Sequence, residues 1–301
     1  GKIGKGLTEY GNEALAYTQA IIVYLAFSIS KATTRNCALA IWEPGMGRLA
    51  GAMGRQALPM QWAFAETNPF ANAGGDIAGT AVSVSEVLDA LMPSADGKEF
   101  QRNASEPYEL GVRPVISTDP PYYDNIEYAE LSDFFYAWLR RSLSAEFPRL
   151  FETLAVPKQE ELVASSTRYG GKDKAEAHFL EGMTRAIRQM SSTASEAYPV
   201  AIYYAFRQSE VEEEGITSTG WATFLEAVIE AGFSVVGTWP LRTEATNALK
   251  KGMNALASSV VLVCRIKVET AETITRAEFV RSLKKELPPA IEDLQAANVS
   301  P

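Results

Sequence analysis

The chain has 301 residues, of which 47% are hydrophobic and 22% charged, so it can bury a large core and is neither disordered nor fibrous in composition. A net charge of −9 argues against a broad, non-specific grip on nucleic acid and leaves room only for local basic patches. Two cysteines, Cys37 and Cys264, exclude a disulfide scaffold and a four-cysteine zinc site within the chain, and they favour a reducing, cytoplasmic setting. The longest apolar run, residues 20–27, is far shorter than the roughly 20 residues of a membrane helix, so no membrane partner is expected.

The N-terminal part, residues 1–98, is predicted to be a helical and loop-rich region. Its composition predicts a helix at 12–32, a short strand at 38–42 and a further helix at 84–91. The stretch 43–79 is rich in Gly, Pro and Asn and is predicted to be a loop.

The region 99–267 is predicted to be the catalytic core, followed by a charged helical tail at 268–301 that breaks at Pro288 and Pro289. The expected elements of the core are strands at 99–103 and 114–118, a helix at 127–143, an irregular insertion at 144–175, a helix at 175–198, a strand at 200–206, a helix at 221–231, and strands at 233–239 and 259–266. Continuous β-branched runs that alternate with helices indicate an α/β fold in which helices cover both faces of the sheet.

One string follows a buried strand directly: TDPPYY, which begins at Thr118. Ligands of open α/β sheets bind outside the carboxyl ends of the strands, so the position suits a site. Prolines lack a backbone N–H, and the loop therefore presents carbonyl oxygens and the Asp119 carboxylate as hydrogen-bond acceptors. Acceptors beside the aromatic ring of Tyr122 suit a planar amino-heterocycle, such as a nucleobase flipped out of a duplex. The purely structural alternative is a Pro-Pro turn in which Asp119 caps the next helix.

The DPPY string resembles motif IV of the S-adenosylmethionine-dependent amino-methyltransferases, which methylate N6 of adenine or N4 of cytosine in DNA. The longer stretch TDPPYYDNIEYAELSDFFYAWLRRSL resembles a narrower group, the large bacterial putative DNA methylases that carry an N-terminal domain of unknown function. The stretches GRQALPMQWAFAETNPF, GGKDKAEAHFLEGM, GTWPLRTE and MNALASSVVLVCR fit that family in the same order. The resemblance runs from about residue 12 to the end, and it implies an internal or C-terminal fragment of such a protein.

The resemblance implies a role for each residue of the motif. The Asp119 carboxylate would accept one hydrogen bond from the target amino group and the main-chain carbonyl of Pro120 the other, which aims the nitrogen lone pair at the methyl sulfonium. Pro121 would hold the loop, and Tyr122 would stack on the flipped base. Direct in-line transfer needs no covalent intermediate, so the single histidine, His178, is not required. Further substrate contacts are expected from Tyr123, Asp124, Asn125, Tyr128 and, on a basic turn that could close over DNA, Lys172.

The resemblance implies a Rossmann-like methyltransferase sheet that would lack its first strands, and it implies S-adenosylmethionine as the cofactor. The strands at 114–118 and 200–206 would be its fourth and fifth, and the last two strands the antiparallel pair at its edge. Asn103, at the end of a third strand, and Thr118 are the candidate cofactor contacts. The glycine-rich cofactor turn of the family is missing: in the nearest string, residues 42–47, the glycines stand too close to the acid, which favours a surface turn.

These observations predict a DNA amino-methyltransferase, with adenine N6 ahead of cytosine N4, in a restriction-modification or phage-defence setting. DNA, the rest of the parent protein and defence-system components are its expected partners, and the activity of the isolated fragment is left open. One alternative keeps the fold and methylates RNA or a protein glutamine, although such enzymes more often carry Asn at the position of Asp119. A second alternative, motivated by the missing glycine turn, is a non-catalytic nucleic-acid-binding module.

Overall fold

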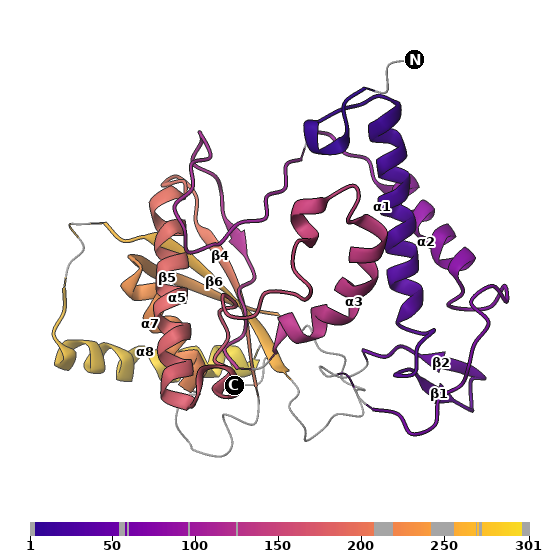
Figure 1. The fold of residues 1–301 in the computed structure, drawn as a ribbon. Helices are drawn as coiled ribbons and strands as arrows, with labels where there is room; N and C mark the ends of the chain where they lie inside the picture. The colour runs from indigo at the N-terminus through magenta and orange to yellow at the C-terminus, as the bar shows by residue number, and fades with distance from the viewer. Residues whose placement is uncertain are drawn as a thin grey trace.

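The computed structural model describes residues 4–53, 58, 60–95, 97–124, 126–207, 219–241, 256–268, 270 and 273–296 (Figure 1). The described helices are η1 (Leu7–Glu9), α1 (Ala14–Thr33), α2 (Ile77–Ala90), α3 (Tyr128–Leu143), η2 (Pro148–Phe151), α4 (Ser166–Tyr169), α5 (Lys172–Thr193), α7 (Thr219–Glu230) and α8 (Arg276–Ala296). The described strands are β1 (Ile41–Glu43), β2 (Arg48–Ala50), β3 (Ser117–Thr118), β4 (Val200–Arg207), β5 (Phe233–Leu241) and β6 (Leu256–Ile266).

The larger sheet has the strand order β3-β4-β6-β5. β3 pairs in parallel with β4, whereas β6 is antiparallel to both β4 and β5. β4 and β5 therefore run in the same direction, and α7 lies between them along the chain. The predicted antiparallel pair at the sheet edge is confirmed, and the fold class is α/β with a mixed sheet.

β3 is shorter than the strand predicted at 114–118, because only Ser117 and Thr118 join the ladder with β4. Pro114 has no N–H to donate, although its carbonyl oxygen accepts a 2.9 Å hydrogen bond from the N–H of Ser195. The chain ahead of the motif is thus tied to the segment between α5 and β4 without forming a long strand.

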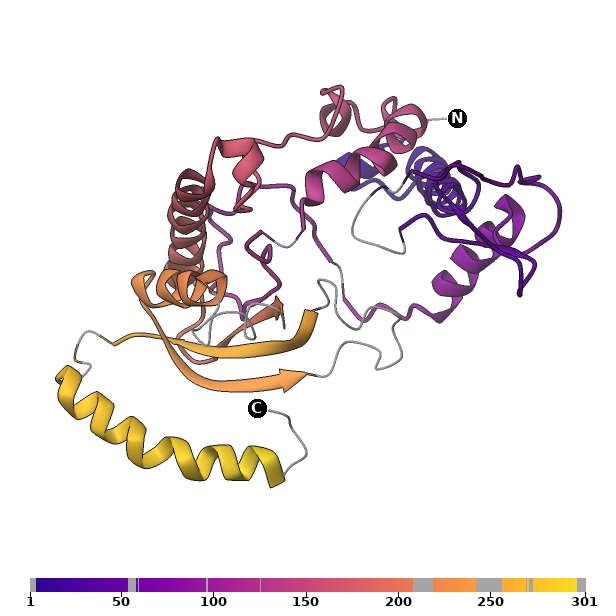
Figure 2. The same cartoon turned by 90° about the horizontal axis from the view of Figure 1, so that it is seen from below.

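The main core lies between the sheet and the helices α5 and α7, which cover one face (Figures 1 and 2). Buried positions recur every three or four residues along α5, as an amphipathic helix requires; they are Ala175, Phe179, Gly182, Met183, Thr184, Ala186 and Ile187. On the opposite face, Tyr203 is 37% and Trp239 69% exposed. α8 lies on that side, yet its residues 276–289 are all exposed. The prediction of helices packed on both faces is therefore confirmed for one face only.

The N-terminal region is built around α1, which packs against α2 and α3. The stretch 43–79 is not one loop as predicted, because β1 and β2 form an antiparallel hairpin and α2 begins at Ile77. Asp76 is the N-cap of α2 and accepts a 2.6 Å hydrogen bond from the N–H of Gly79. This cap explains why α2 starts well before the predicted helix at 84–91.

Two helices differ from their predictions in a way that the sequence explains. With 20 residues, α1 is long and apolar enough by length and composition to cross a membrane, because small residues extend the apolar character beyond residues 20–27. α8 runs through Pro288 and Pro289, which were predicted to break it. α8 is exposed at 276–289, so water can satisfy the carbonyl groups of the preceding turn that lose their donors there.

Candidate functional site

The motif loop, Asp119 to Tyr122, leaves the sheet at the carboxyl end of β3, as the sequence predicts. The Asp119 side chain is exposed, whereas Pro120, Pro121 and Tyr122 are partly buried. The Tyr122 hydroxyl donates a 2.6 Å hydrogen bond to Oδ1 of Asp119. The structure thus brings the predicted carboxylate acceptor and the predicted stacking ring into direct contact at the sheet edge.

The Tyr122 ring packs against aromatic residues of the core. It meets the ring of Tyr204 edge-on, with centroids 5.7 Å apart, and Tyr204 in turn stacks on Phe224 at 4.0 Å. Burial raises the pKa of the Tyr122 phenol, and the hydrogen bond and negative charge of Asp119 raise it further. Tyr122 is therefore a neutral hydrogen-bond donor whose ring has a fixed place beside Asp119.

Tyr123 does not face a substrate as predicted, because its side chain is buried in the core. Its ring meets Phe179 of α5 edge-on with centroids 5.2 Å apart, and its carbonyl oxygen accepts a 2.9 Å hydrogen bond from the N–H of Ala164. Its φ of 44° lies in the left-handed region, which is costly for a residue with a Cβ. Tyr123 therefore anchors the end of the loop in the core, whereas Asp119 at its start is exposed.

The other predicted substrate contacts fall into three groups. Tyr128, the first residue of α3, does reach the motif, because it forms a hydrogen bond with the backbone of Tyr122. Burial raises the pKa of the Tyr128 phenol, and this hydrogen bond partly offsets the rise. Asp124 and Lys172 are exposed, and no contact between Lys172 and Asp119 is described in the structure. Asn125 lies outside the described residues.

A buried arginine fixes the end of the predicted insertion against the helix that follows the motif. The Arg168 side chain is only 7% exposed and forms ion pairs with Glu130 at 2.6 Å and Glu161 at 2.8 Å. Oε1 of Glu161 also accepts a 2.9 Å hydrogen bond from the N–H of Ala129. Burial lowers the pKa of Arg168, but the hydrogen bonds to Glu161 and Glu130 outweigh this effect and raise it above the ordinary value. We call Glu130, Glu161 and Arg168 the arginine clamp.

The arginine clamp organises the neighbouring groups as well. His178 lies with Nε2 3.1 Å from the carbonyl oxygen of Glu161, and its ring stacks on Tyr169 at 4.0 Å. The Ser165 hydroxyl contacts the Glu127 carboxylate just before α3. His178 is thus a structural residue here, and side-chain contacts hold the segment 158–171, which lies in the insertion predicted to be irregular and includes the short helix α4.

Asp133 makes the stability of the same region depend on pH. Its carboxylate accepts hydrogen bonds from Nζ of Lys158 at 2.7 Å and from the N–H of Val156 at 2.8 Å. Burial raises the pKa of Asp133, but these two hydrogen bonds outweigh it and lower the pKa below its ordinary 3.8. A lowered pKa means that the ionised carboxylate stabilises the fold above the unfolded-state pKa, and that this stabilisation is lost as the pH falls through the folded-state pKa.

We therefore expect Asp133→Asn to flatten the acid limb of the stability curve. Urea unfolding measured from about pH 7 down to about pH 3 should show a smaller loss of stability in this variant than in the wild type. Glu86→Gln on the exposed side of α2 is the matched control and should leave the curve unchanged. Equal acid limbs for wild type and Asp133→Asn would contradict this role.

Of the two candidate cofactor contacts, Thr118 directly precedes the motif loop, whereas no contact between Asn103 and that loop is described. The strand predicted at 99–103 is wrong, because this described segment is irregular and the Asn103 side chain accepts a 3.0 Å hydrogen bond from the N–H of Ser105 within its own turn. Thr118 is partly buried at the end of β3. The string at 42–47 forms the β1–β2 hairpin, closed by an ion pair of Glu43 with Arg48 at 2.9 Å, so its interpretation as a surface turn is confirmed.

Comparison with protein-family models, with curated proteins and with solved structures finds no match for this chain. The motif loop and the sheet that presents it are therefore the features of the chain that indicate a function. The geometry offers an exposed carboxylate acceptor, Asp119, and the supported aromatic ring of Tyr122 at the carboxyl end of a parallel strand. Such an arrangement can hold a flat ring that carries an amino group.

Proposed function

We propose that this chain is the catalytic part of a DNA amino-methyltransferase, and that Asp119 to Tyr122 receive the exocyclic amino group of a flipped adenine or cytosine. The observation that carries the proposal is the acceptor loop at the carboxyl end of β3. The strand order β3-β4-β6-β5, with β6 reversed, supports the finer interpretation of β3 and β4 as the fourth and fifth strands of a Rossmann-like methyltransferase sheet.

The motif residues would act by hydrogen bonding and stacking. The Asp119 carboxylate and the Pro120 carbonyl would accept the two N–H bonds of the amino group, which makes its lone pair available for methyl transfer. The Tyr122 ring would cover one face of the base. Because the Tyr122 hydroxyl occupies Oδ1 of Asp119, the incoming amino group has to displace that hydrogen bond or use the second carboxylate oxygen.

The described residues fit the base side of the reaction and not a cradle for S-adenosylmethionine. β3 is the outermost strand of the described sheet, the glycines at 42–47 belong to a hairpin turn, and Asn103 is engaged in its own turn. The amino-group acceptors of the proposed reaction would therefore be supplied by this chain. We expect the residues that bind S-adenosylmethionine to lie outside the described part of the chain.

Asp119→Ala tests the proposal. The intact protein that carries this chain is produced in a host that lacks its own DNA base methylation, and N6-methyladenine and N4-methylcytosine are quantified in digested DNA by mass spectrometry. Loss of a charged acceptor in the transition state should lower methylation about 100- to 1,000-fold. Because Asp119 is exposed, stability should not change. The control Glu152→Ala removes another exposed carboxylate and should keep the wild-type level.

The same experiment separates the alternatives. Methylation of RNA or of protein glutamine that depends on Asp119, without methylated DNA bases, would keep the fold and replace the substrate. Unchanged DNA methylation in Asp119→Ala, with the variant shown to be folded, would overturn the proposal.

A further inference from the structure

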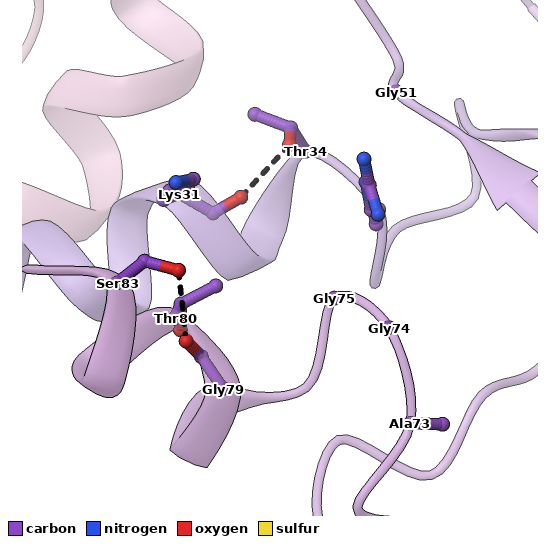
Figure 3. Close-up of a pocket in the computed structure, with 10 residues that line it drawn as sticks. Lys31, Thr34, Gly51, Ala73, Gly74, Gly75, Gly79, Thr80 and Ser83 are labelled. Carbon is purple, nitrogen blue, oxygen red and sulfur yellow. Dashed lines mark hydrogen bonds between the residues drawn. The ribbon is translucent and has the colours of Figure 1, made fainter. Parts of the chain in front are cut away.

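A pocket of about 480 Å³ opens between the last turn of α1 and the first turns of α2 (Figure 3). Lys31 and Arg35 come from the end of α1 and the residues after it, and Thr80 and Ser83 come from α2. The loop before α2 contributes Gly75 and its neighbours. The volume is sufficient for a phosphodiester group together with an attached sugar.

The charge in this pocket is positive. Among the described residues that line it, Lys31 and Arg35 carry charge and none is a carboxylate. The structure describes no ion pair for either cation. Asp76, next to the pocket, is buried and already engaged with the N–H of Gly79. Two cations and no carboxylate thus line one cavity in a chain whose net charge is −9, so the local charge is opposite to that of the whole chain.

The glycine loop is shaped around the arginine. Gly75 has a φ of +97°, and a Cβ at this position would lie 2.6 Å from Cδ of Arg35, so a larger residue would displace the arginine side chain. No hydrogen bond is described for the backbone N–H groups of Gly74 and Gly75. Two cations beside amide groups of a glycine-rich turn are the donors that an anionic phosphate prefers.

We propose that this pocket binds a phosphate of the nucleic-acid backbone and so helps to hold the substrate at the motif loop. The second clause rests on the proposed function, whereas phosphate binding does not. α1 packs against α3, whose first residues follow the motif loop. In Figure 1 the end of α1 that carries Lys31 and the beginning of α3 lie toward the same, lower side of the molecule. A duplex that reaches the motif from this side would bring its backbone to the pocket.

The test is the salt dependence of DNA binding by the full chain, measured by fluorescence anisotropy with a labelled duplex. Each phosphate contact contributes about one unit to the slope of log K against log salt. Lys31→Gln/Arg35→Gln should therefore remove this one phosphate contact, reduce the slope by about one unit and weaken binding about tenfold at low salt. Lys31→Arg/Arg35→Lys keeps both charges and should retain most of the slope.

The matched control is Arg281→Gln/Lys284→Gln on the exposed α8, which removes the same two positive charges far along the chain. Equal changes in the control and in the pocket variant would overturn the proposal, since only net charge would then matter.

Titration with deoxyadenosine monophosphate distinguishes the sources of phosphate. Mononucleotide binding that depends on Lys31 and Arg35, with an unchanged DNA slope, would overturn the assignment to nucleic acid. Methyl transfer is not part of this readout, so a failed Asp119 experiment leaves it intact.

Discussion

Replacing Arg168 by methionine is expected to lower the free energy of unfolding by about 3–5 kcal/mol, because it leaves a buried charge without its partner. The Arg168 side chain is 7% exposed and that of Glu161 12% exposed, so water cannot replace the lost guanidinium freely. The variant also removes the ion pair with Glu130 and the hydrogen bond to the carbonyl of Lys158. Methionine keeps the length of the apolar stem, which limits the effect of lost packing. Urea unfolding at neutral pH measures the change.

Three variants give this prediction its specificity. Arg141→Met removes an exposed arginine from the end of α3 and should cost less than about 0.5 kcal/mol. Arg168→Lys keeps the charge but loses the forked geometry, so it should fall between wild type and Arg168→Met. Arg168→Met/Glu161→Met removes both buried charges and should be more stable than Arg168→Met alone. A loss below about 1 kcal/mol for Arg168→Met would show that the arginine clamp contributes little to folding.

The sequence predicts the elements whose apolar residues recur with a strong period. It does not predict the features that depend on contacts between residues far apart in the chain. The helix predicted at 127–143 matches α3 closely, and the strand predicted at 200–206 matches β4, because each carries its own apolar pattern. α5 begins at Lys172, ahead of the predicted residue 175, since its first turn is polar and exposed and carries no apolar signal.

The same distinction applies to the candidate site. The position of the motif loop follows from a local string behind an apolar strand, so the sequence predicts it. The arginine clamp joins Arg168 to Glu130, 38 positions away, and only the folded chain brings them together. The role of Tyr123 likewise depends on residues 164, 179 and 220, and its neighbours in sequence give no sign of it.

Tyr123→Ala is expected to lower the free energy of unfolding by about 3–5 kcal/mol, since it removes a large ring from the core and leaves a cavity. The ring packs on Phe179, which is fully buried, and lies so close to α7 that a Cβ on Gly220 would meet Cδ1 of Tyr123 at 2.8 Å. Gly220→Ala should therefore be destabilising too, by about 1–3 kcal/mol, as overpacking forces the ring to move. Tyr203→Ala, on the open face of the sheet, is the control for the loss of a tyrosine and should cost clearly less.

Tyr123→Gly separates the ring from the backbone. At a φ of 44° glycine relieves about 1 kcal/mol of strain that alanine retains, so the glycine variant should be the more stable of the two despite the greater freedom of its unfolded chain. The reverse order, or a loss in Tyr123→Ala no larger than in Tyr203→Ala, would mean that the ring does not anchor the loop. With the expected order, Tyr123 variants lower stability whereas Asp119→Ala does not. Two residues of one loop would then have different roles, one in folding and one in the proposed reaction. Tyr123 fixes the loop to the core, whereas Asp119 lies exposed at the end of β3, where the amino group of the proposed substrate would meet it.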